Sequence, residues 1–456
     1  MNSLAIIILA AGKGTRMKSA MVKILHPVAG VPMLSYSLAV ARKLTPQKLV
    51  VVVGFQGEVV RQQFSAPDLI FAEQTEQLGT GHAVQIAVQP LQGFQGTVLI
   101  LCGDVPLLTE DTVQRFLLTH REKKATLSVL TTLLQNPKNY GRIFRREDGQ
   151  LLRIVEDKDL QAGEEGIREI NTGIYCVESK FLFSALPSLT DRNAQREYYL
   201  TDLVAQANAQ EEKTFGYVAD NPFEVMGINT RSDLAKAAQY MRQKINERHM
   251  LDGVTLIDPA TTYIDQTVEI GRETVIYPNC FLMGKTFLGE SCVIEPGCKI
   301  VDTRVGNSVT VKVSSVISES VIADQVEIGP FAHLRPQNTL RERSKVGNFV
   351  ELKKSVLGKG SKANHLSYIG DTTIGEKVNV GAGTITCNYD GKKKHPTLIE
   401  DEVFIGSNTA LVAPIKIGRN ALIGAGSTIT KEVPPDTLAV TRAKQMHYKK
   451  RSPCKE

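Results

Sequence analysis

Cysteine and long hydrophobic runs are both scarce in this chain, and each shortage excludes a class of protein. The 456 residues include seven cysteines, an odd number, and no two of them form a CxxC pair. This pattern indicates neither a disulfide framework nor a zinc site. No apolar run approaches the ~20 residues of a membrane-spanning helix. The first apolar stretch, Leu4–Ile8, has no basic flank before it and leads directly into glycines, so it predicts a core strand and not a signal peptide. We expect a cytoplasmic protein without a membrane span.

Excess charge is also small, with a formal net charge of only +6. A nucleic-acid-binding protein usually concentrates its positive charge in a stripe. Here the dense basic stretches are Lys392–Lys394 and the tail from Arg442 to Lys455. Short runs of this kind are typical of solvated faces or of contacts to phosphorylated small molecules, and we expect no nucleic-acid partner. The apolar content of 42% and the length of 456 residues predict a folded protein of two to three domains.

Before about residue 229, short apolar runs alternate with helical patterns. Leu49–Val53 and Val98–Cys102 are almost wholly apolar, as in strands that are covered on both faces. Pro32–Leu44 and Thr109–His120 carry helical spacing. This alternation predicts an α/β domain, residues 1–229, with a Rossmann-like, mostly parallel sheet. Ligands of such sheets bind beyond the carboxyl ends of the strands, which places Gly12–Arg16 and Gly103–Pro106 at one rim.

A six-residue period replaces this pattern from about residue 264. Large aliphatic residues recur at Ile264, Ile270, Ile276, Leu282, Leu288, Ile294 and Ile300, and again at Ile399, Ile405, Leu411, Ile417, Ile423 and Ile429. Small residues follow four positions later in the first run, among them Cys280, Cys292 and Cys298. This period predicts a left-handed parallel β-helix of hexapeptide repeats over residues 252–456, with the three cysteines as corner fillers. The register slips between Phe331 and Tyr389, and such deviations are where we expect a site.

The segment between the two patterns, residues 230–251, predicts one connecting helix. Leu234, Ala238, Met241 and Ile245 follow helical spacing. Thr230 and Asp233 form a weak capping pair at its start. We therefore expect residues 1–229 and 252–456 to fold as separate units.

The stretch LAAGKGTRM, Leu9–Met17, follows the first predicted strand but matches neither the P-loop nor the GxGxxG fingerprint. A bend at Gly12 and Gly14 exposes N–H groups that can surround phosphate oxygens. Arg16 adds a planar fork and Lys23 a point charge, both suited to a polyphosphate, so we expect both to act in catalysis. The alternative is a plain strand-to-helix turn with basic residues on its surface.

Asp104 ends a buried strand near this loop, where a carboxylate is costly unless it is paired or bound to a cation. A strand-end aspartate that faces a phosphate loop is suited to Mg²⁺, which bridges substrate phosphates. The alternative is that Asp104 caps the helix after Pro106. Asn229 is open to the same two interpretations, as a metal ligand or as the cap of the connecting helix, and by itself the cap is favoured.

Taken together, several motifs resemble the sugar nucleotidyltransferases. They are LAAGKGTRM with Lys23, EQLGTGHA (Glu76–Ala83), GDVP, YGRI (Tyr140–Ile143), VEDKD (Val155–Asp159), EINTGIY (Glu169–Tyr175) and EYYLTD (Glu197–Asp202). The nearest likeness is to the bacterial bifunctional family of N-acetylglucosamine-1-phosphate uridylyltransferases / glucosamine-1-phosphate N-acetyltransferases, and it covers nearly the whole chain in order. The resemblance implies transfer of a uridylyl group from UTP to a sugar 1-phosphate, with release of pyrophosphate.

The resemblance also assigns roles in the first domain. It implies that Gln74, Gly79 and Thr80 bind the uracil, that Gly141, Glu156 and Asn171 bind the N-acetylhexosamine, and that Asp104 and Asn229 bind Mg²⁺. The full set expected to contact UTP or UDP-N-acetylglucosamine is Leu9, Ala10, Ala11, Gly12, Lys23, Gln74, Gly79, Thr80, Cys102, Gly103, Asp104, Gly141, Glu156, Asn171 and Asn229. Two residues depart from the family pattern: Cys102 stands where tyrosine is common and Arg196 where glycine is common, which leaves the shape of the sugar pocket open.

His365 is the chemically notable residue of the second domain. Histidine ordinarily titrates near ~6.5 and can accept a proton at neutral pH, although a lone histidine is more often a hydrogen-bonded surface residue. GKGSKANHLSYIGD (Gly358–Asp371) and NVGAGTITCNYDG (Asn379–Gly391) resemble the acetyltransferase half of the same family. That likeness implies that His365 is the general base toward glucosamine 1-phosphate. It assigns Arg335, Lys353, Tyr368 and Asn379 to the sugar phosphate, and Ala382, Asn388, Tyr389, Ser407, Ala425 and Arg442 to acetyl-CoA.

The sequence therefore predicts a bifunctional enzyme, trimeric by the family resemblance, that acetylates glucosamine 1-phosphate with acetyl-CoA and then uridylylates the product to UDP-N-acetylglucosamine, a precursor of cell-wall and outer-envelope polysaccharides. One alternative is a glucose- or mannose-type nucleotidyltransferase whose β-helix is only regulatory or structural. EQLGTGHA and the His365 segment argue against it. Another is a β-helix scaffold without catalysis, which would not need Arg335, Lys353 and His365 where the repeat is broken.

Overall fold

The computed structural model describes residues 3–449, so the end of the basic tail predicted from Arg442 to Lys455 lies outside the described residues. The chain divides into two compact units between Met241 and Arg242, and each is described by itself. Across residues 3–449, no helix is long and apolar enough to cross a membrane.

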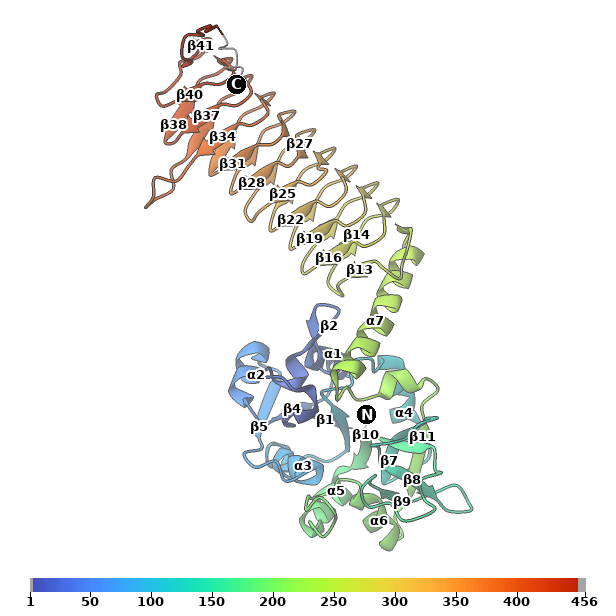
Figure 1. Ribbon diagram of the computed structural model, residues 1–456. Coiled ribbons are helices and arrows are strands. Elements are labelled where there is room, and N and C mark those ends of the chain that lie inside the picture. The colour runs from blue at the N-terminus through green and yellow to red at the C-terminus, as the bar shows by residue number, and fades with distance from the viewer. Residues whose placement is uncertain (1–2, 450–456) are drawn as a thin grey trace, which may run out of the picture. The chain divides into compact units, whose positions relative to one another are not determined.

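The first unit is built on a mixed, mostly parallel sheet (Figure 1). Its main order is β11-β7-β10-β6-β1-β4-β5, with β8 and β9 attached beside β10. The strands are β1 Leu4–Leu9, β4 Lys48–Val53, β5 Leu69–Glu73, β6 Thr97–Cys102, β7 Leu127–Leu133, β8 Arg142–Arg145, β9 Leu151–Val155, β10 Glu169–Glu178 and β11 Thr214–Val218, and a short hairpin pairs β2 Pro27–Val28 with β3 Val31–Pro32. β10 is antiparallel to both of its neighbours in the main order, whereas β1 runs parallel to β4 and β6. The predicted Rossmann-like fold is confirmed.

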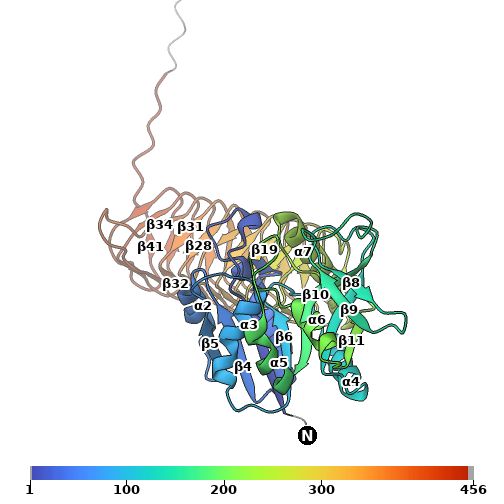
Figure 2. The ribbon, with the colours of Figure 1, turned by 90° about the horizontal axis from the view of Figure 1, so that it is seen from below.

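Helices cover both faces of this sheet, which explains why its central strands are apolar at every position. Ala5 and Ile7 of β1 pack on one side with α3 Thr80–Val88, α5 Ser179–Ala185 and α6 Asp202–Ala209. Ile6 and Ile8 pack on the other side with α1 Met33–Lys43, α2 Gly57–Phe64 and α4 Glu110–Glu122. Figure 2 shows α3, α5 and α6 lying over one face.

The second unit is a parallel β-helix of three sheets (Figure 1). The first sheet holds β12 Thr255–Leu256, β15 Val275–Ile276, β18 Val293–Ile294, β21 Thr310–Val311, β24 Glu327–Ile328, β27 Lys345–Asn348, β30 Lys362–His365, β33 Asn379–Val380, β36 Phe404–Ile405, β39 Leu422–Ile423 and β41 Leu438–Ala439. The second holds β13 Tyr263–Ile264, β16 Phe281–Met283, β19 Lys299–Val301, β22 Val316–Ser318, β25 His333–Leu334, β28 Glu351–Lys353, β31 Tyr368–Gly370, β34 Ile385–Cys387, β37 Ala410–Val412 and β40 Thr428–Ile429. The third holds β14 Glu269–Ile270, β17 Phe287–Leu288, β20 Arg304–Val305, β23 Val321–Ile322, β26 Thr339–Leu340, β29 Val356–Leu357, β32 Thr372–Ile374, β35 Thr397–Ile399 and β38 Ile415–Ile417.

The six-residue period is confirmed as the interior of this β-helix. Apart from Ile270, which is half-buried, the predicted aliphatic positions are buried, and Cys280, Cys292 and Cys298 are fully buried free thiols beside them. The predicted fold class, a left-handed parallel β-helix after an α/β domain, is therefore correct.

The expected loss of register between Phe331 and Tyr389 is wrong in extent. The ladder of paired strands continues through this region, with Leu334, Leu340, Val346, Leu352 and Leu357 all buried in the interior. The steps between them are six residues except from Leu352 to Leu357, and the same five-residue step already occurs between Ile300 and Val305. Corners that are one residue shorter keep the strands of successive coils paired. The long interruption of the β-helix is the loop between β34 and β35, which carries Lys392–Lys394.

The connecting segment forms α7 Arg231–Leu251. Thr230 and Asp233 cap it reciprocally: the Asp233 carboxylate accepts from the Thr230 N–H at 2.9 Å, and the Thr230 hydroxyl accepts from the Asp233 N–H at 3.1 Å. This is the capping-box geometry that the sequence predicted.

Candidate functional site

A cavity of about 480 Å³ opens at the carboxyl ends of β1 and β6 in the first unit. It is lined by Leu9, Ala11, Gly12, Lys13, Gly14, Thr15, Gln74, Gln77, Gly79, Thr80, Ala83, Cys102, Asp104 and Glu197. The cavity therefore lies at the edge of the sheet where the sequence predicted ligand binding. Of the predicted contacts, Leu9, Ala11, Gly12, Gln74, Gly79, Thr80, Cys102 and Asp104 line this cavity.

Two predicted backbone contacts are engaged elsewhere. The Ala10 N–H donates to the Val52 carbonyl at 2.9 Å, and the Gly103 N–H donates to the Leu9 carbonyl at 2.9 Å. Both amides thus extend the sheet pairing of β1 and do not line the cavity.

The loop after β1 requires glycine at position 14. Its backbone has a φ of 60°, and a Cβ there would lie 2.6 Å from the Cβ of Lys23. Only glycine allows this close approach in the left-handed region without strain. The bend brings Lys23 under the loop, toward the end of β6.

Lys23, Asp104 and Asn229 form one cluster. The Lys23 ammonium forms an ion pair with the Asp104 carboxylate, and both side chains are largely buried. The same ammonium donates to Asn229 Oδ1 at 2.8 Å, and Arg16 donates to that oxygen at 2.9 Å. A backbone hydrogen bond of 2.9 Å from the Ile228 N–H to the Asp104 carbonyl brings the two segments together.

This cluster rules out both capping alternatives. α4 is capped by Thr109, whose hydroxyl accepts from the Thr112 N–H at 3.3 Å, so Asp104 is not its cap. α7 is capped by Thr230 and Asp233, and the Asn229 side chain points to Lys23 and Arg16 instead. Neither residue is needed for helix termination, and the oxygens of both side chains face the cations Lys23 and Arg16.

The donor set of Asp104 and Asn229 fits a hard divalent cation. One carboxylate and one amide oxygen lie against a common ammonium group, so a small cation can contact both. Mg²⁺ is usually held by one or two carboxylates together with substrate phosphates. Within residues 3–449 there is no group of three His, Cys, Asp or Glu side chains that could hold a metal.

The three residues assigned to the sugar lie together, with Gly141 just before β8, Glu156 just after β9 and Asn171 at the bulge of β10. A Cβ at Gly141 would lie 3.4 Å from Glu156 Oε1 and 3.5 Å from the Asn171 Cβ. The Asn171 N–H donates to the Gly141 carbonyl at 2.9 Å, which fixes the two segments against each other. Gly141, Glu156 and Asn171 therefore form one cluster.

The two departures from the family pattern have clear structural settings. Cys102 lines the cavity, and burial raises the pKa of its thiol well above the ordinary value, so it stays protonated. Its Sγ lies 3.4 Å from the Gly173 carbonyl. Arg196 has a φ of 53°, in the left-handed region that favours glycine.

Glu156 carries the pH dependence that we expect of the first unit. Burial raises its pKa from 4.5 to about 7, and the negative charges of Asp159, Asp202 and Glu197 add to this effect. Because the folded pKa lies above the unfolded one, the folded state loses stability as the pH rises from about 4.5 to about 7, and the full cost remains above that range.

Glu156→Gln is expected to stabilise the first unit above pH 7 by up to about 3 kcal/mol, because a neutral amide avoids the buried charge. The gain should disappear as the pH falls toward 4.5. Calorimetric unfolding across this pH range measures it, and Glu147→Gln, at an exposed position, is the matched control. A gain that does not change with pH would contradict the burial of an ionised carboxylate.

A second cavity, of about 460 Å³, lies along the first sheet of the β-helix. His365 at the end of β30 lines it together with Asn379, Ala382, Ser407 and Ala425, all predicted site residues. The His365 Nδ1 lies 2.6 Å from Oδ1 of Asn348, its partner on β27. The imidazole ring thus stands at the edge of a cavity that is lined by small residues and by apolar ones such as Phe404 and Leu422, a lining that suits an acyl donor.

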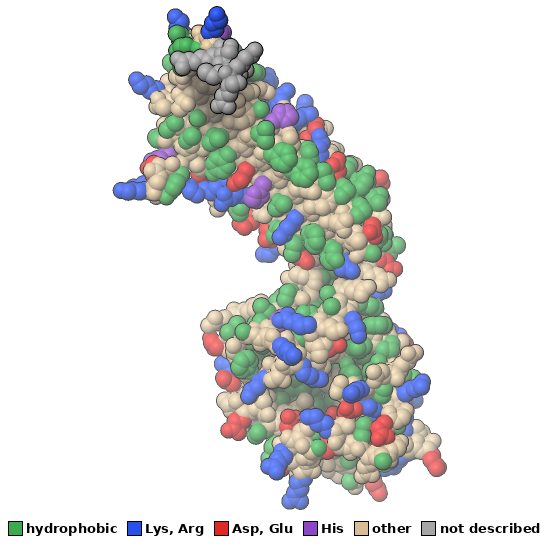
Figure 3. All heavy atoms as spheres, in the orientation of Figure 1, with side chains coloured by type: hydrophobic (Ala, Val, Ile, Leu, Met, Phe, Trp, Pro, Cys, Tyr) green, Lys and Arg blue, Asp and Glu red, His purple; other side chains and the backbone are tan. Residues whose placement is uncertain are grey.

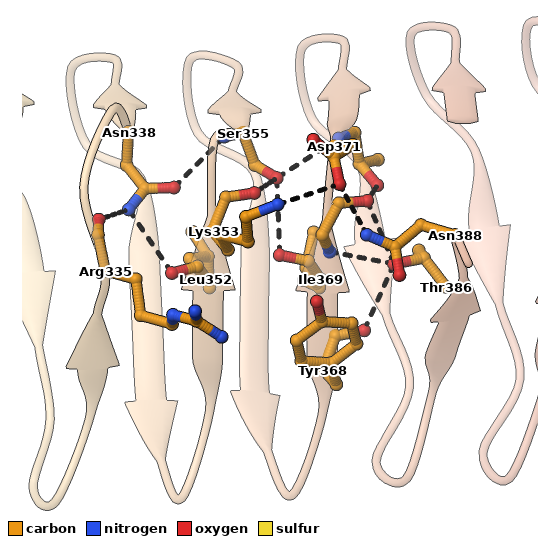
Figure 4. A network of polar contacts seen from close by, with 12 residues as sticks. Arg335, Asn338, Leu352, Lys353, Ser355, Tyr368, Ile369, Asp371, Thr386 and Asn388 are labelled. Carbon is orange, nitrogen blue, oxygen red and sulfur yellow. Dashed lines mark hydrogen bonds and ion pairs between the residues drawn. The ribbon is translucent and has the colours of Figure 1, made fainter. Parts of the chain in front are cut away.

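Arg335, Lys353 and Tyr368 lie on the neighbouring second sheet, outside this cavity (Figure 4). Lys353 pairs with Asp371 at 3.2 Å, and Arg335 pairs with Glu351 at 3.1 Å. Lys394, from the loop after β34, contacts Lys353, and the hydrogen bond to that side chain together with its like charge lowers the pKa of Lys394. The three cations make this surface a candidate phosphate site.

The remaining predicted acetyl-CoA residues do not line the second cavity. Asn388 donates to Asp371 Oδ2 at 2.5 Å, on the Lys353 side. Tyr389 is exposed, and its hydroxyl donates to the Gly391 carbonyl at 2.6 Å. Arg442 packs against Gly424, a cavity-lining residue, since a Cβ there would lie 3.6 Å from an Arg442 nitrogen.

Some residues at the two sites were not predicted from the sequence. Gln77 and Glu197 line the first cavity, and Asn348, Asp371 and Lys394 contact predicted residues of the second unit. Glu197 and Asp371 stand inside the motifs that carried the resemblance. Lys394 belongs to the lysine-rich loop, but its partner could not be read from the chain.

Comparisons with known proteins agree with this geometry. Residues 6–173 match the MobA-like NTP transferase domain, and residues 396–431 match the bacterial transferase hexapeptide family of six repeats. The chain is 53% identical over 448 residues to the bifunctional protein GlmU of Geotalea uraniireducens, with 98% of each chain covered. It is 52% identical to that of Pelobacter propionicus, covering 98% of this chain and 97% of the relative. It is 50% identical to that of Geobacter sulfurreducens, with 98% of both covered.

Proposed function

This chain belongs to the family of bifunctional GlmU proteins, and we propose that its two units divide the work of making UDP-N-acetylglucosamine. The protein is a transferase with two activities. It acetylates glucosamine 1-phosphate from acetyl-CoA, and it transfers a uridylyl group from UTP to the N-acetylated product. UDP-N-acetylglucosamine is a precursor of the bacterial cell wall. The observation that carries this conclusion is likeness over the whole length to bifunctional relatives, and each unit has a cavity lined by predicted site residues.

We assign uridylyl transfer to residues 1–229, which lie within the first unit. Gln74 would position Gly79 for uracil binding, because its buried amide nitrogen donates to the Gly79 carbonyl at 3.1 Å. Gly141, Glu156 and Asn171 would orient the sugar, so that its phosphate oxygen attacks the α-phosphorus of UTP and pyrophosphate leaves. Arg16 and Lys23 would neutralise the charge on the phosphates, which is the main task of the protein in phosphoryl transfer.

Asp104 and Asn229 would hold Mg²⁺ in this unit. When bound, the ion neutralises charge on the substrate phosphates. Lys23 contacts both side chains and holds them close to each other.

We assign acetyl transfer to residues 252–456, which lie within the second unit, with residues 230–251 as the connecting helix. His365 would take a proton from the amine of glucosamine 1-phosphate. The free amine would attack the thioester carbonyl of acetyl-CoA, and the coenzyme A thiolate would leave. Arg335, Lys353, Tyr368 and Asn379 would hold the sugar phosphate. The path of acetyl-CoA would be lined by Ala382, Asn388, Tyr389, Ser407, Ala425 and Arg442. We propose that the reaction takes place in the cytoplasm, where its substrates are available.

A trimer is the assembly that we propose, and an exposed apolar ridge supports it. Figure 3 shows apolar side chains among charged ones on the visible face of the second unit. Phe331, Phe349 and Leu366 are 48%, 57% and 62% exposed, and all three have left-handed φ angles. Bulky residues in this conformation cost roughly 1–2 kcal/mol each. Residues that are both strained and exposed are consistent with burial against a second copy.

Phe349→Gly is expected to weaken assembly while leaving the folded protomer as stable or more stable, because glycine suits its φ of 54°. Sedimentation velocity across a concentration series measures the shift toward smaller species. Arg343→Gly is the matched control, since Arg343 is an exposed corner residue with a φ of 57°. Unchanged assembly of the Phe349 variant would remove the ridge from the interface.

The experiment that tests the function supplies glucosamine 1-phosphate, acetyl-CoA, UTP and Mg²⁺ together and follows UDP-N-acetylglucosamine. Formation of this product only when all four are present is the expected result. A single-activity nucleotidyltransferase with a structural β-helix would require N-acetylglucosamine 1-phosphate to be supplied. Folded protein that makes no product under the complete conditions would contradict the assignment.

A further inference from the structure

Asn348 is the side chain that the structure places directly against the ring of His365. β27 and β30 are longer than most strands of the first sheet, and the pair Asn348–His365 closes their ladder at the corner. Oδ1 of Asn348 lies 2.6 Å from Nδ1 of His365. The Asn348 carbonyl also accepts from the Leu366 N–H at 3.0 Å. One residue therefore contacts both the ring and the backbone that follows it.

The backbone of His365 is held from the opposite side as well. Its carbonyl accepts from the Ser367 hydroxyl at 2.9 Å and from the Gly383 N–H at 3.3 Å. Leu366, the next residue, has a φ of 49°, a conformation that a leucine adopts only when its surroundings impose it. With the backbone fixed in this way, the remaining freedom of His365 is the rotation and the tautomer of its ring.

We infer that Asn348 is a positioning residue for acetyl transfer, which selects the His365 tautomer with the proton on Nδ1 and the lone pair on Nε2. An amide oxygen can only accept, so a 2.6 Å contact with it requires Nδ1 to donate. This inference rests on the proposed role of His365 as the general base. It adds which ring nitrogen is the base and which residue decides it.

The proton balance follows from this assignment. Nε2 accepts a proton from the amine as the C–N bond to the acetyl carbon forms and the C–S bond of the thioester breaks. Nδ1 keeps its own proton, and the hydrogen bond to Asn348 becomes charge-assisted in the imidazolium, which strengthens it at that moment. Without Asn348, part of the population carries the proton on Nε2 and cannot act as a base.

The test measures acetyl and uridylyl transfer by the full-length chain in four variants: Asn348→Ala, Asn348→Asp, His365→Ala and the double variant Asn348→Ala/His365→Ala. Loss of a partner that orients a functional histidine commonly costs about 10–100-fold, so Asn348→Ala should lower the kcat of acetyl transfer by that factor with little change in KM for acetyl-CoA. Asn348→Asp retains an accepting oxygen and should recover most of the rate. In the His365→Ala background, removing Asn348 should cost less than about twofold, because coupled residues are not additive.

Each outcome separates this inference from the proposed function. Uridylyl transfer, measured in the same samples, reports whether a variant is folded and active in its other unit. A normal kcat for Asn348→Ala, or an equal loss with and without His365, would overturn the positioning role while leaving His365 as the base. Undiminished acetyl transfer by His365→Ala would instead overturn the proposed base, and the inference with it.

Discussion

His365→Ala is expected to lower acetyl transfer by about 10²–10⁴-fold, the usual contribution of a positioned proton acceptor. The ring stands at the edge of the second cavity, which it lines together with small residues such as Ala382 and Ala425. Binding of acetyl-CoA should change little, because these residues and the backbone around them are unaltered. Acetyl transfer is measured by the release of free coenzyme A thiol from acetyl-CoA with glucosamine 1-phosphate as acceptor.

The control for this variant lies within the same chain. Uridylyl transfer from supplied N-acetylglucosamine 1-phosphate should be unchanged, because the first cavity belongs to the other compact unit. His447→Ala, at an exposed histidine in the tail after the last strand, should leave both activities intact. A folded His365→Ala variant that keeps more than about a tenth of the parent rate would lose less than a general base supplies, and the assignment would be wrong.

The architecture could be predicted because both repeating patterns are dictated by burial. A strand covered on both faces is apolar at every position, as Leu4–Leu9 is, since its alternate residues enter the two cores. The β-helix repeats one inward residue per sheet, so Ile276, Leu282 and Leu288 mark three successive sheets by their spacing alone. The antiparallel β10 has no such signature, because pairing direction leaves no trace in composition.

The partner of His365 could not be predicted, for a reason that lies in the coil length. A strict six-residue period makes each coil 18 residues long and would place Gly347 beside His365. The five-residue step from Leu352 to Leu357 shortens this coil by one residue, and Asn348 occupies the place instead. A single shortened corner thus changes which side chain meets the ring.

The cluster around Lys23 was only partly predictable for a related reason. The rule for parallel sheets brought the phosphate loop and Asp104 to the same rim. Asn229 lies far along the chain, and its role depends on the hydrogen bond between the Ile228 N–H and the Asp104 carbonyl. Local pattern favoured a capping role for Asn229, but Thr230 and Asp233 already satisfy the helix start. Contacts between distant segments, and not the local sequence, therefore determine that Asn229 lies beside Lys23 and Asp104.

Asp104→Ala is expected to lower uridylyl transfer by about 10²–10⁴-fold, because it removes the one carboxylate of a site suited to a divalent cation, worth several kcal/mol of charge stabilisation. Acetyl transfer should persist, since the second cavity lies in the other unit. The substitution also leaves the ammonium of Lys23, whose side chain is 12% exposed, without its anionic partner. Some loss of stability is therefore expected, and activity must be compared with folded protein.

Asp104→Asn separates the lost charge from the lost contact. The amide has the shape of the carboxylate and can still accept from Lys23, so the fold should be retained. It binds Mg²⁺ weakly, however, because hard cations prefer charged oxygen ligands. We expect uridylyl transfer by this variant to need a much higher Mg²⁺ concentration for half-maximal rate, measured as pyrophosphate release across a metal titration. If both variants turned over near the parent rate with an unchanged metal requirement, Asp104 would serve only to hold Lys23, and the cation would have to be bound elsewhere.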